Sequence, residues 1–299
     1  MAGTDPLGDA GAITLDTTLI QREVRRFLDE DIGAGDLTTR STVSADARIR
    51  GTLVAREPCV VAGLAVAAAV FAELDPQLRM APGVSDGARL PAAGVIATIA
   101  GRAAPILTGE RVALNLLQRL SGIATMTRRY VDEIAGTGAS ISDTRKTSPG
   151  MRAFEKYAVR AGGGRNHRAG LSDAILIKDN HIAAAGGVAM ALGAVRAAGV
   201  RLPVQIEVDD LEQLASALAG GVDAVLLDNM PPDIVAAAVR SIRGHANGAH
   251  CWIEASGGIT LANVRRYAEA GVDTISIGAL THSAPAVDIA LDLTIAPTP

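Results

Sequence analysis

The N-terminal half of the chain mixes helical apolar stripes with short apolar runs. Apolar residues recur every three or four positions over 16–30, where Asp16 or Thr17 can cap a helix, and again over 111–129. The apolar run at 59–72 is shorter than the roughly 20 residues that cross a bilayer, so we expect a buried helix there.

Short apolar runs bounded by Gly and Pro also occur in this half, at 52–56, 95–100 and 106–107. Such runs are typical of strands. Combined with the helical stretches around them, they predict a small α+β domain.

After about residue 130 the pattern changes to six short apolar runs, each followed by a polar, charged or glycine residue. Runs rich in Ile, Val and Leu that do not alternate with polar residues are typical of parallel strands covered on both faces. Helical stretches separate most of the runs, which predicts a parallel sheet, open or closed. The runs end at Ile141, Ile177, Ile206, Leu227, Ile253 and Ile277.

A faint internal repeat supports this interpretation. Residues 219–229 and 270–279 share one order: the end of a helix, Gly-Val-Asp, an apolar run and a polar terminus. Their Val222 and Val272 lie 50 positions apart. That distance suits two successive units of about 25 residues in a (β/α) barrel.

The ends of the predicted strands carry the candidate chemistry. In (β/α) barrels, the carboxyl ends of the strands and the loops after them form the active site. Cations follow the early strands and carboxylates the middle ones, which predicts a pocket for an anionic ligand, although any one of these residues fits a strand end that faces water equally well. The residues are Arg145, Lys146, Lys178, Glu207, Asp228 and Glu254.

Lysine use points to the same region. All three lysines, Lys146, Lys156 and Lys178, fall within 33 consecutive positions of a chain with 28 Lys and Arg residues. Lysine is a compact ammonium on a flexible stem and arginine a planar fork, so the two suit different chemistry. Residues 145–178 carry eight basic side chains and two acidic ones, in a chain of net charge −4. This stretch is either a solvated basic loop or an anion pocket.

Glycine-bearing loops follow the last two predicted strands, at 256–259 and 277–280. Glycine lets backbone N–H groups approach an oxyanion, and late barrel loops are frequent phosphate sites. These patterns predict a barrel that binds a phosphorylated, multiply anionic substrate. They do not identify the substrate.

The segment 161–168 contains three consecutive glycines and then Arg165, His167 and Arg168. It predicts a flexible loop that places these side chains over the pocket. A lone histidine is more often structural than catalytic. Beside two arginines, His167 is expected to donate a hydrogen bond to an acidic ligand.

Composition narrows the class of protein. The 299 residues are 48% apolar and 20% charged, which is typical of a globular protein. The net acidity and the 2% aromatic content argue against nucleic-acid and membrane-surface binding. Cys59 and Cys251 lie far apart without CxxC spacing, which predicts neither a zinc site nor a disulfide framework and favours a cytoplasmic location. Residues 1–12 lack a signal-peptide pattern and are expected to form a frayed tail.

Five motifs occur in a fixed order along the chain: RVALNLLQRLSGIAT at 111–125, DTRKTSPG at 143–150, GGRNHR at 163–168, IKDNH at 177–181 and EASGGI at 254–259. Together they resemble the quinolinate phosphoribosyltransferases, also called carboxylating nicotinate-nucleotide pyrophosphorylases. The resemblance runs from about Leu15 to Asp288.

The resemblance implies a pentosyltransferase that converts quinolinate and phosphoribosyl pyrophosphate to nicotinate mononucleotide, pyrophosphate and CO₂ in NAD biosynthesis. It also implies Mg²⁺ and a homodimer, with assembly beyond the dimer left open. The implied α/β fold has an N-terminal α/β sandwich domain, 1–117, on which 282–299 can pack back. An incomplete (β/α) barrel of parallel strands follows, 118–281, whose mouth the partner's N-terminal domain covers.

Site residues follow from the same resemblance. The implied catalytic residues are Lys146, Lys178, Glu207 and Asp228. Glu207 and Asp228 meet the ribose hydroxyls, directly or through Mg²⁺. The residues implied for quinolinate are Arg145, His167, Arg168 and Lys178, with Thr144 also in the substrate site and Arg111 donated by the other subunit. Those implied for the 5′-phosphate are Ser256, Gly257, Gly258, Gly278 and Ala279.

Other functions stay open on the residues alone. A barrel lyase or aldolase would use Lys178 to form a Schiff base. A phosphate-ligand-binding protein without activity would leave the carboxylates of Glu207 and Asp228 without a role. A related phosphoribosyltransferase for another aromatic acid fits the cluster of cations less well.

Overall fold

The computed structural model describes residues 15–295, and the tail predicted at 1–12 lies outside them. The described residues form two compact units. The first, which we term the N-terminal unit, contains 15–128, 153–163 and 283–295. The second, the barrel unit, contains 129–152 and 164–282.

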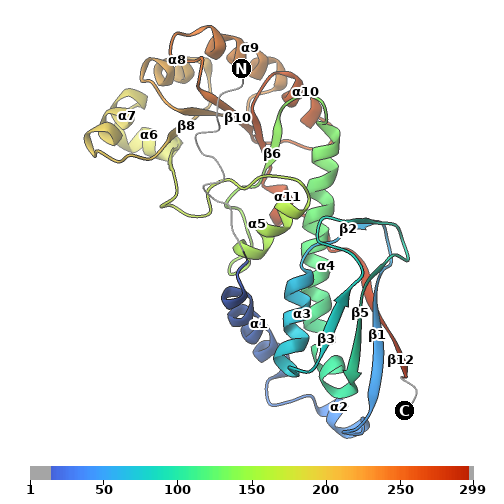
Figure 1. The fold of residues 1–299 in the computed structure, drawn as a ribbon. Coiled ribbons are helices and arrows are strands. Elements are labelled where there is room, and N and C mark those ends of the chain that lie inside the picture. Colours follow the sequence, from blue (N-terminus) through green and yellow to red (C-terminus); the bar gives the residue numbers. More distant parts are fainter. Residues whose placement is uncertain (1–14, 296–299) are drawn as a thin grey trace. The chain divides into compact units, whose positions relative to one another are not determined.

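The N-terminal unit is built on an antiparallel four-stranded sheet with the order β12-β1-β5-β3 (Figure 1). Its strands are β1 (Arg48–Ala55), β3 (Arg79–Pro82), β5 (Val95–Arg102) and β12 (Ile289–Ile295), and a separate pair joins β2 (Cys59–Val60) to β4 (Arg89–Leu90). The runs predicted at 52–56 and 95–100 are confirmed as parts of β1 and β5. β12 pairs with β1 from Ile49↔Ile295 to Ala55↔Ile289, so the C-terminal strand completes the sheet.

Helices accompany this sheet, and Figure 1 shows α3 and α4 beside it. They are α1 (Thr17–Ile32), α2 (Leu37–Thr42), α3 (Leu64–Leu74), α4 (Ala103–Glu133) and α5 (Arg152–Ala161). As predicted, Asp16 caps α1, because its carboxylate accepts a hydrogen bond from the N–H of Leu19 at 2.8 Å. The buried face of α1 is Ile20, Val24 and Leu28, which is the apolar stripe of the sequence.

The strand predicted at 106–107 is wrong. These residues lie in α4, one helix of 31 residues. Gly109 looks like a turn signal in the sequence, but a Cβ there would come within 2.8 Å of Leu74 on α3, so glycine lets the two helices pack closely. In the sequence, the first boundary between the two units falls inside α4, between Arg128 and Arg129. The boundary predicted from the sequence is 117/118.

The single helix predicted over 59–72 is also wrong at its start. β2 takes the first two residues, Gly63 adopts a φ of 101°, and α3 begins only at Leu64. The carboxylate of Asp86 accepts hydrogen bonds from the N–H groups of Gly63 and Leu64, at 3.0 and 3.2 Å. A cap from a distant residue therefore sets the start of this helix.

The barrel unit holds a six-stranded sheet with the order β6-β11-β10-β9-β8-β7, in which every pairing is parallel (Figure 1). All six predicted runs are confirmed as strands. They are β6 (Ser140–Ser142), β7 (Ile175–Ile177), β8 (Val204–Val208), β9 (Ala224–Asp228), β10 (Trp252–Ser256) and β11 (Thr274–Ser276). Since β6 and β7 are end strands, the barrel is incomplete within the described residues.

Helices separate most of the strands: α6 (Asp179–Ala185), α7 (Val188–Ala197), α8 (Leu211–Ala219), α9 (Pro232–Gly244), α10 (Val264–Glu269) and α11 (Ala279–His282). Between Val222 and Val272 lie β9, α9, β10 and α10, so the repeat does span two strand–helix units. No helix within 15–295 has the length and apolar character needed to span a membrane.

Candidate active site

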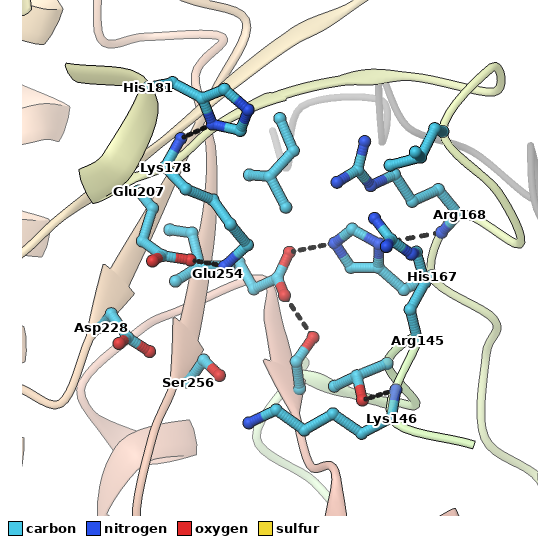
Figure 2. Close-up of a pocket in the computed structure, with 15 residues that line it drawn as sticks. Arg145, Lys146, His167, Arg168, Lys178, His181, Glu207, Asp228, Glu254 and Ser256 are labelled. Carbon is cyan, nitrogen blue, oxygen red and sulfur yellow. Dashed lines mark hydrogen bonds and ion pairs between the residues drawn. The ribbon is translucent and has the colours of Figure 1, made fainter. Parts of the chain in front are cut away.

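The carboxyl ends of the parallel strands surround a cavity of about 500 Å³ in the barrel unit (Figure 2). Each strand, or the loop after it, contributes to the lining. The cavity brings together ten of the residues singled out in the sequence: Thr144, Arg145, Lys146, His167, Arg168, Lys178, Glu207, Asp228, Glu254 and Ser256.

Arginines dominate one side of the cavity. Arg145 follows β6, and its buried Nε has no hydrogen-bond partner among the described residues. Arg168 is only 7% exposed, and its Nη1 donates to the carbonyl of Ala174 at 3.0 Å. Burial, and then the positive charge of Arg145, lower the pKa of Arg168. Two guanidinium groups that lie close enough to repel each other, one of them with an N–H that has no acceptor, favour the binding of an anionic ligand.

Carboxylates occupy the other side. Lys178 is the N-cap residue of α6, and its Nζ forms an ion pair with Glu207 on β8 (Figure 2). Burial raises the pKa of Glu207 against the opposing effect of Lys178, and the neighbouring charge of Asp228 adds to the rise. Burial likewise raises the pKa of Asp228, which ends β9. This side therefore suits hydroxyl groups or cationic charge.

Glycines and Lys146 form a third part of the site. Gly257 and Gly258 follow β10 with φ values of 90° and 62°. A Cβ on Gly257 would come within 2.1 Å of the Asn229 side chain, so a larger residue does not fit there. A Cβ on Gly278 would lie 3.0 Å from Cδ of Lys146. The Lys146 side chain thus passes beside the glycine loop at Gly278, and glycine loops with a nearby ammonium suit an oxyanion.

Comparison with known sequences identifies the family. The profile described as "Quinolinate phosphoribosyl transferase, N-terminal domain" matches residues 36–121, and that of the C-terminal domain matches residues 123–292. The chain belongs to the quinolinate phosphoribosyltransferase family.

Individual family members are similar over most of their length. The "Nicotinate-nucleotide pyrophosphorylase [carboxylating]" of Mycobacterium leprae is 49% identical over 273 residues, which cover 90% of this chain and 95% of that protein. A probable enzyme of the same name from Bacillus subtilis is 44% identical over 92% of this chain and 94% of its own. The crystal structure of NadC from Streptococcus pyogenes is 40% identical, with a TM-score of 0.89, covering 94% of this chain and 98% of that one.

Not every predicted residue of this family member lines the cavity. Gly257, Gly258 and Gly278 lie in loops that follow lining residues, and Ala279 is the first residue of α11. Arg111 lies on α4 in the N-terminal unit and is exposed.

Arg165 does not face the cavity, contrary to the sequence-based expectation. Its guanidinium lies over the ring of Trp252, 6.0 Å from the centroid, and its backbone N–H donates to the carbonyl of Ile141. The segment is thus held against β6, and only His167 and Arg168 reach the pocket.

Five lining residues were not singled out in the sequence. Leu171, Leu176 and Leu226 supply apolar wall that suits an aromatic ring. Leu176 and Leu226 sit within unbroken apolar runs, so no sequence signal separates pocket-facing positions from core positions. The remaining two are His181 and Ser276. His282, beside the glycine loop at Gly278, was also not predicted; its Nε2 would lie 3.2 Å from a Cβ on Gly278.

We expect Asp228→Asn to stabilise the protein at neutral pH. Because burial raises the pKa of Asp228 above 3.8, the folded state binds this proton more tightly than the unfolded state. The contribution of Asp228 to stability is then fully present below pH 3.8 and is lost as the pH rises through its raised pKa. Asparagine removes that loss, so the melting temperature at pH 7 should rise above that of the parent while turnover falls.

Thermal unfolding of both proteins across a pH series checks this. The difference in melting temperature should shrink as the pH falls towards the ordinary value for an aspartate. A variant no more stable than the parent at pH 7 would contradict the prediction.

Proposed function

We propose that this protein transfers the phosphoribosyl group of phosphoribosyl pyrophosphate to quinolinate and decarboxylates the product, giving nicotinate mononucleotide, pyrophosphate and CO₂. The observation that carries the proposal is the division of one cavity into an arginine side and a carboxylate side with glycine loops next to them. The names of the similar proteins from Mycobacterium leprae and Bacillus subtilis support it.

The arginine side fits the acidic substrate. Two adjacent ring carboxylates need paired donors, and arginine offers them in a planar fork. Arg145 and Arg168 supply two such groups, with an unused Nε on Arg145. The apolar wall from Leu171 and Leu176 suits the flat ring that carries these carboxylates. Quinolinate would thus be oriented with its ring nitrogen towards the ribose.

The carboxylate side fits the ribose. As the bond from C1′ to pyrophosphate breaks and the bond from C1′ to the ring nitrogen forms, positive charge develops on the ribose. Glu207 and Asp228 can stabilise this charge and accept hydrogen bonds from the hydroxyls. Lys178, paired with Glu207, and Lys146, beside Gly278, place positive charge where the anionic substrates and the leaving group lie.

Decarboxylation then follows from the first step. Once ribosylated, the ring nitrogen is cationic and stabilises the carbanion left on the adjacent carbon when its carboxylate departs as CO₂. Protonation of that carbon completes nicotinate mononucleotide. The chain therefore needs no Schiff base for this step.

Mg²⁺ is part of the proposal. Within residues 15–295, no group of three or more His, Cys, Asp or Glu side chains is arranged so that it could hold a metal ion by itself. Mg²⁺ usually binds through one or two carboxylates together with substrate phosphates, so Glu207 and Asp228 fit a site shared with phosphoribosyl pyrophosphate. When bound, the ion would offset negative charge on the departing pyrophosphate.

We also propose a homodimer in which Arg111 enters the partner's site. Exposure of Arg111 on α4 and its position in the N-terminal unit support this. The cytoplasmic location is part of the same proposal; both cysteines, Cys59 and Cys251, are buried and unpaired.

The decisive assay mixes the protein with quinolinate, phosphoribosyl pyrophosphate and Mg²⁺ and follows nicotinate mononucleotide and CO₂. Product should form only when all three are present, and a chelator should abolish it. Nicotinate replaces quinolinate in a control that lacks one ring carboxylate and should give no CO₂. Folded protein that forms no product would refute the function.

Borohydride trapping addresses the Schiff-base alternative. Lys178 is engaged in an ion pair with Glu207, whereas a Schiff-base lysine must attack a carbonyl. We therefore expect no covalent adduct. An adduct at Lys178 that depends on substrate would replace the phosphoribosyl-transfer assignment.

A further inference from the structure

Glu254 is a buried carboxylate beneath the arginine side of the cavity, and the proposed function gives it no task. It lies on β10 and is 1% exposed. Its carboxylate accepts hydrogen bonds from three groups of other segments: Nε2 of Gln205 at 2.7 Å, the hydroxyl of Ser276, and Nε2 of His167 at 3.4 Å. Figure 2 shows its carboxylate directed at the ring of His167. A buried negative charge beside a site for a doubly negative substrate is unfavourable. We therefore expect the Glu254 carboxylate to have a specific role.

The ring of His167 is engaged at both nitrogens. Nε2 faces Glu254, and Nδ1 accepts a hydrogen bond from the backbone N–H of Arg168 at 2.8 Å. Because Nδ1 is an acceptor, Nε2 carries the ring proton and donates the hydrogen bond to Glu254. The imidazole thus connects Glu254 to the backbone of Arg168.

A second buried carboxylate holds the same segment from its other end. Asp143 is 0% exposed and accepts hydrogen bonds from the backbone N–H of His167 at 2.9 Å and from Nδ2 of Asn166 at 2.6 Å. Asp143 therefore secures the backbone before the imidazole, and Glu254 secures the imidazole itself. The next residue along the chain is Arg168, whose guanidinium lines the cavity.

We propose that Glu254 is a positioning residue for dicarboxylate recognition: through Nε2 of His167 it fixes the backbone at Arg168 and hence the direction of the Arg168 guanidinium. In this arrangement His167 orients an arginine, and its ring nitrogens are not free to bind the substrate. The inference rests on the proposed function, because it assigns Arg168 to the quinolinate carboxylates.

To hold His167, the geometry requires the side-chain length of Glu254 and not its charge. A glutamine could place its carbonyl oxygen where Gln205 and His167 donate and turn its amide towards the Ser276 hydroxyl, which can accept. An aspartate keeps the charge but is one methylene shorter, and the contact with His167 is already the longest of the three. Glu254→Gln and Glu254→Asp therefore separate the two properties in nearly equal volumes.

The test measures quinolinate binding by calorimetry together with the KM for each substrate. Glu254→Gln should bind quinolinate like the parent, whereas Glu254→Asp should bind it about tenfold more weakly or worse, because misplacing a binding group by a fraction of an ångström carries costs of this size. The KM for phosphoribosyl pyrophosphate should stay unchanged in both, since none of its proposed contacts involves Glu254, His167 or Arg168. Gln205→Met is the matched control: it removes a different hydrogen bond to Glu254, so stability should fall and quinolinate binding should not.

A double-variant comparison tests whether Glu254 acts through His167. His167→Phe keeps an aromatic ring but lacks both Nε2–H and the Nδ1 acceptor, so it should weaken quinolinate binding as Glu254→Asp does. Combining the two should cause no further loss, because both break one connection.

Additive losses would overturn the inference, as would equal binding by the parent and Glu254→Asp, or a glutamine variant as weak as the aspartate variant. In each of those cases the parent still binds quinolinate, so the proposed function stands. A parent that does not bind quinolinate would instead refute the function, and this inference with it.

Discussion

Replacing Lys178 by alanine should lower kcat/KM by about 10²–10³-fold, the usual cost of removing one charged or polar group that stabilises a transition state. Lys178 lines the cavity at the end of β7 and pairs with Glu207. Its loss would remove a positive charge that lies beside the anionic substrates, and it would leave the buried carboxylate of Glu207 without its partner. Steady-state kinetics with both substrates varied measures the effect.

Lys156 provides the matched comparison, because it is a lysine of the same cluster in the sequence. It lies in α5, in the N-terminal unit, and is 0% exposed. Removing a fully buried side chain costs stability, so Lys156→Met, which keeps the volume, is a better control than Lys156→Ala. Turnover per folded molecule should stay near that of the parent, even where the melting temperature falls. Equal losses of turnover in the two lysine variants would contradict the assignment of Lys178.

Local signals in the sequence were sufficient to predict the strands of the barrel unit. Several of its strands are short runs of β-branched and aliphatic residues that end at a polar group, as in Ala224–Asp228, and buried parallel strands need little else. Because parallel strands end at one edge, placing Glu207 and Asp228 at strand ends also placed them in one cavity. The prediction of a shared site thus rested on topology.

Long-range packing explains what the sequence could not reveal in the N-terminal unit. Gly109 interrupts an apolar run and suggests a turn, but its role is to admit Leu74 of another helix. Gly63 starts α3 with help from Asp86, which is 23 positions away. Such partners become visible only when the chain is folded.

The interior of the site was hidden for a similar reason. Glu254 could be recognised as a polar strand end, but its three donors come from Gln205, Ser276 and His167, which are scattered over the chain. Neither their pairing nor the direction of the His167 ring can be derived from spacing. Sequence patterns locate such a residue, and the hydrogen bonds around it decide whether it touches a ligand or positions a residue that does.

Two inactive variants should restore each other if Arg111 acts across a dimer interface. A chain with Arg111→Ala keeps an intact barrel, and a chain with Lys178→Ala keeps an intact Arg111. In a mixed dimer, the barrel of the first chain receives the arginine of the second, so one site is complete and the other lacks both groups. Purified mixed dimers should therefore recover about half of the parent's turnover, whereas each variant alone stays nearly inactive.

Coexpression of the two chains with different affinity tags, followed by purification over both, isolates the mixed species. A mixed dimer of parent and Lys178→Ala chains is the control, since it too should hold one complete site and show the same turnover. If Arg111 served the barrel of its own chain, every site in the dimer of two variants would lack either Arg111 or Lys178, and no activity would return. The comparison thus separates donation across the interface from action within one chain, whatever the size of either single effect.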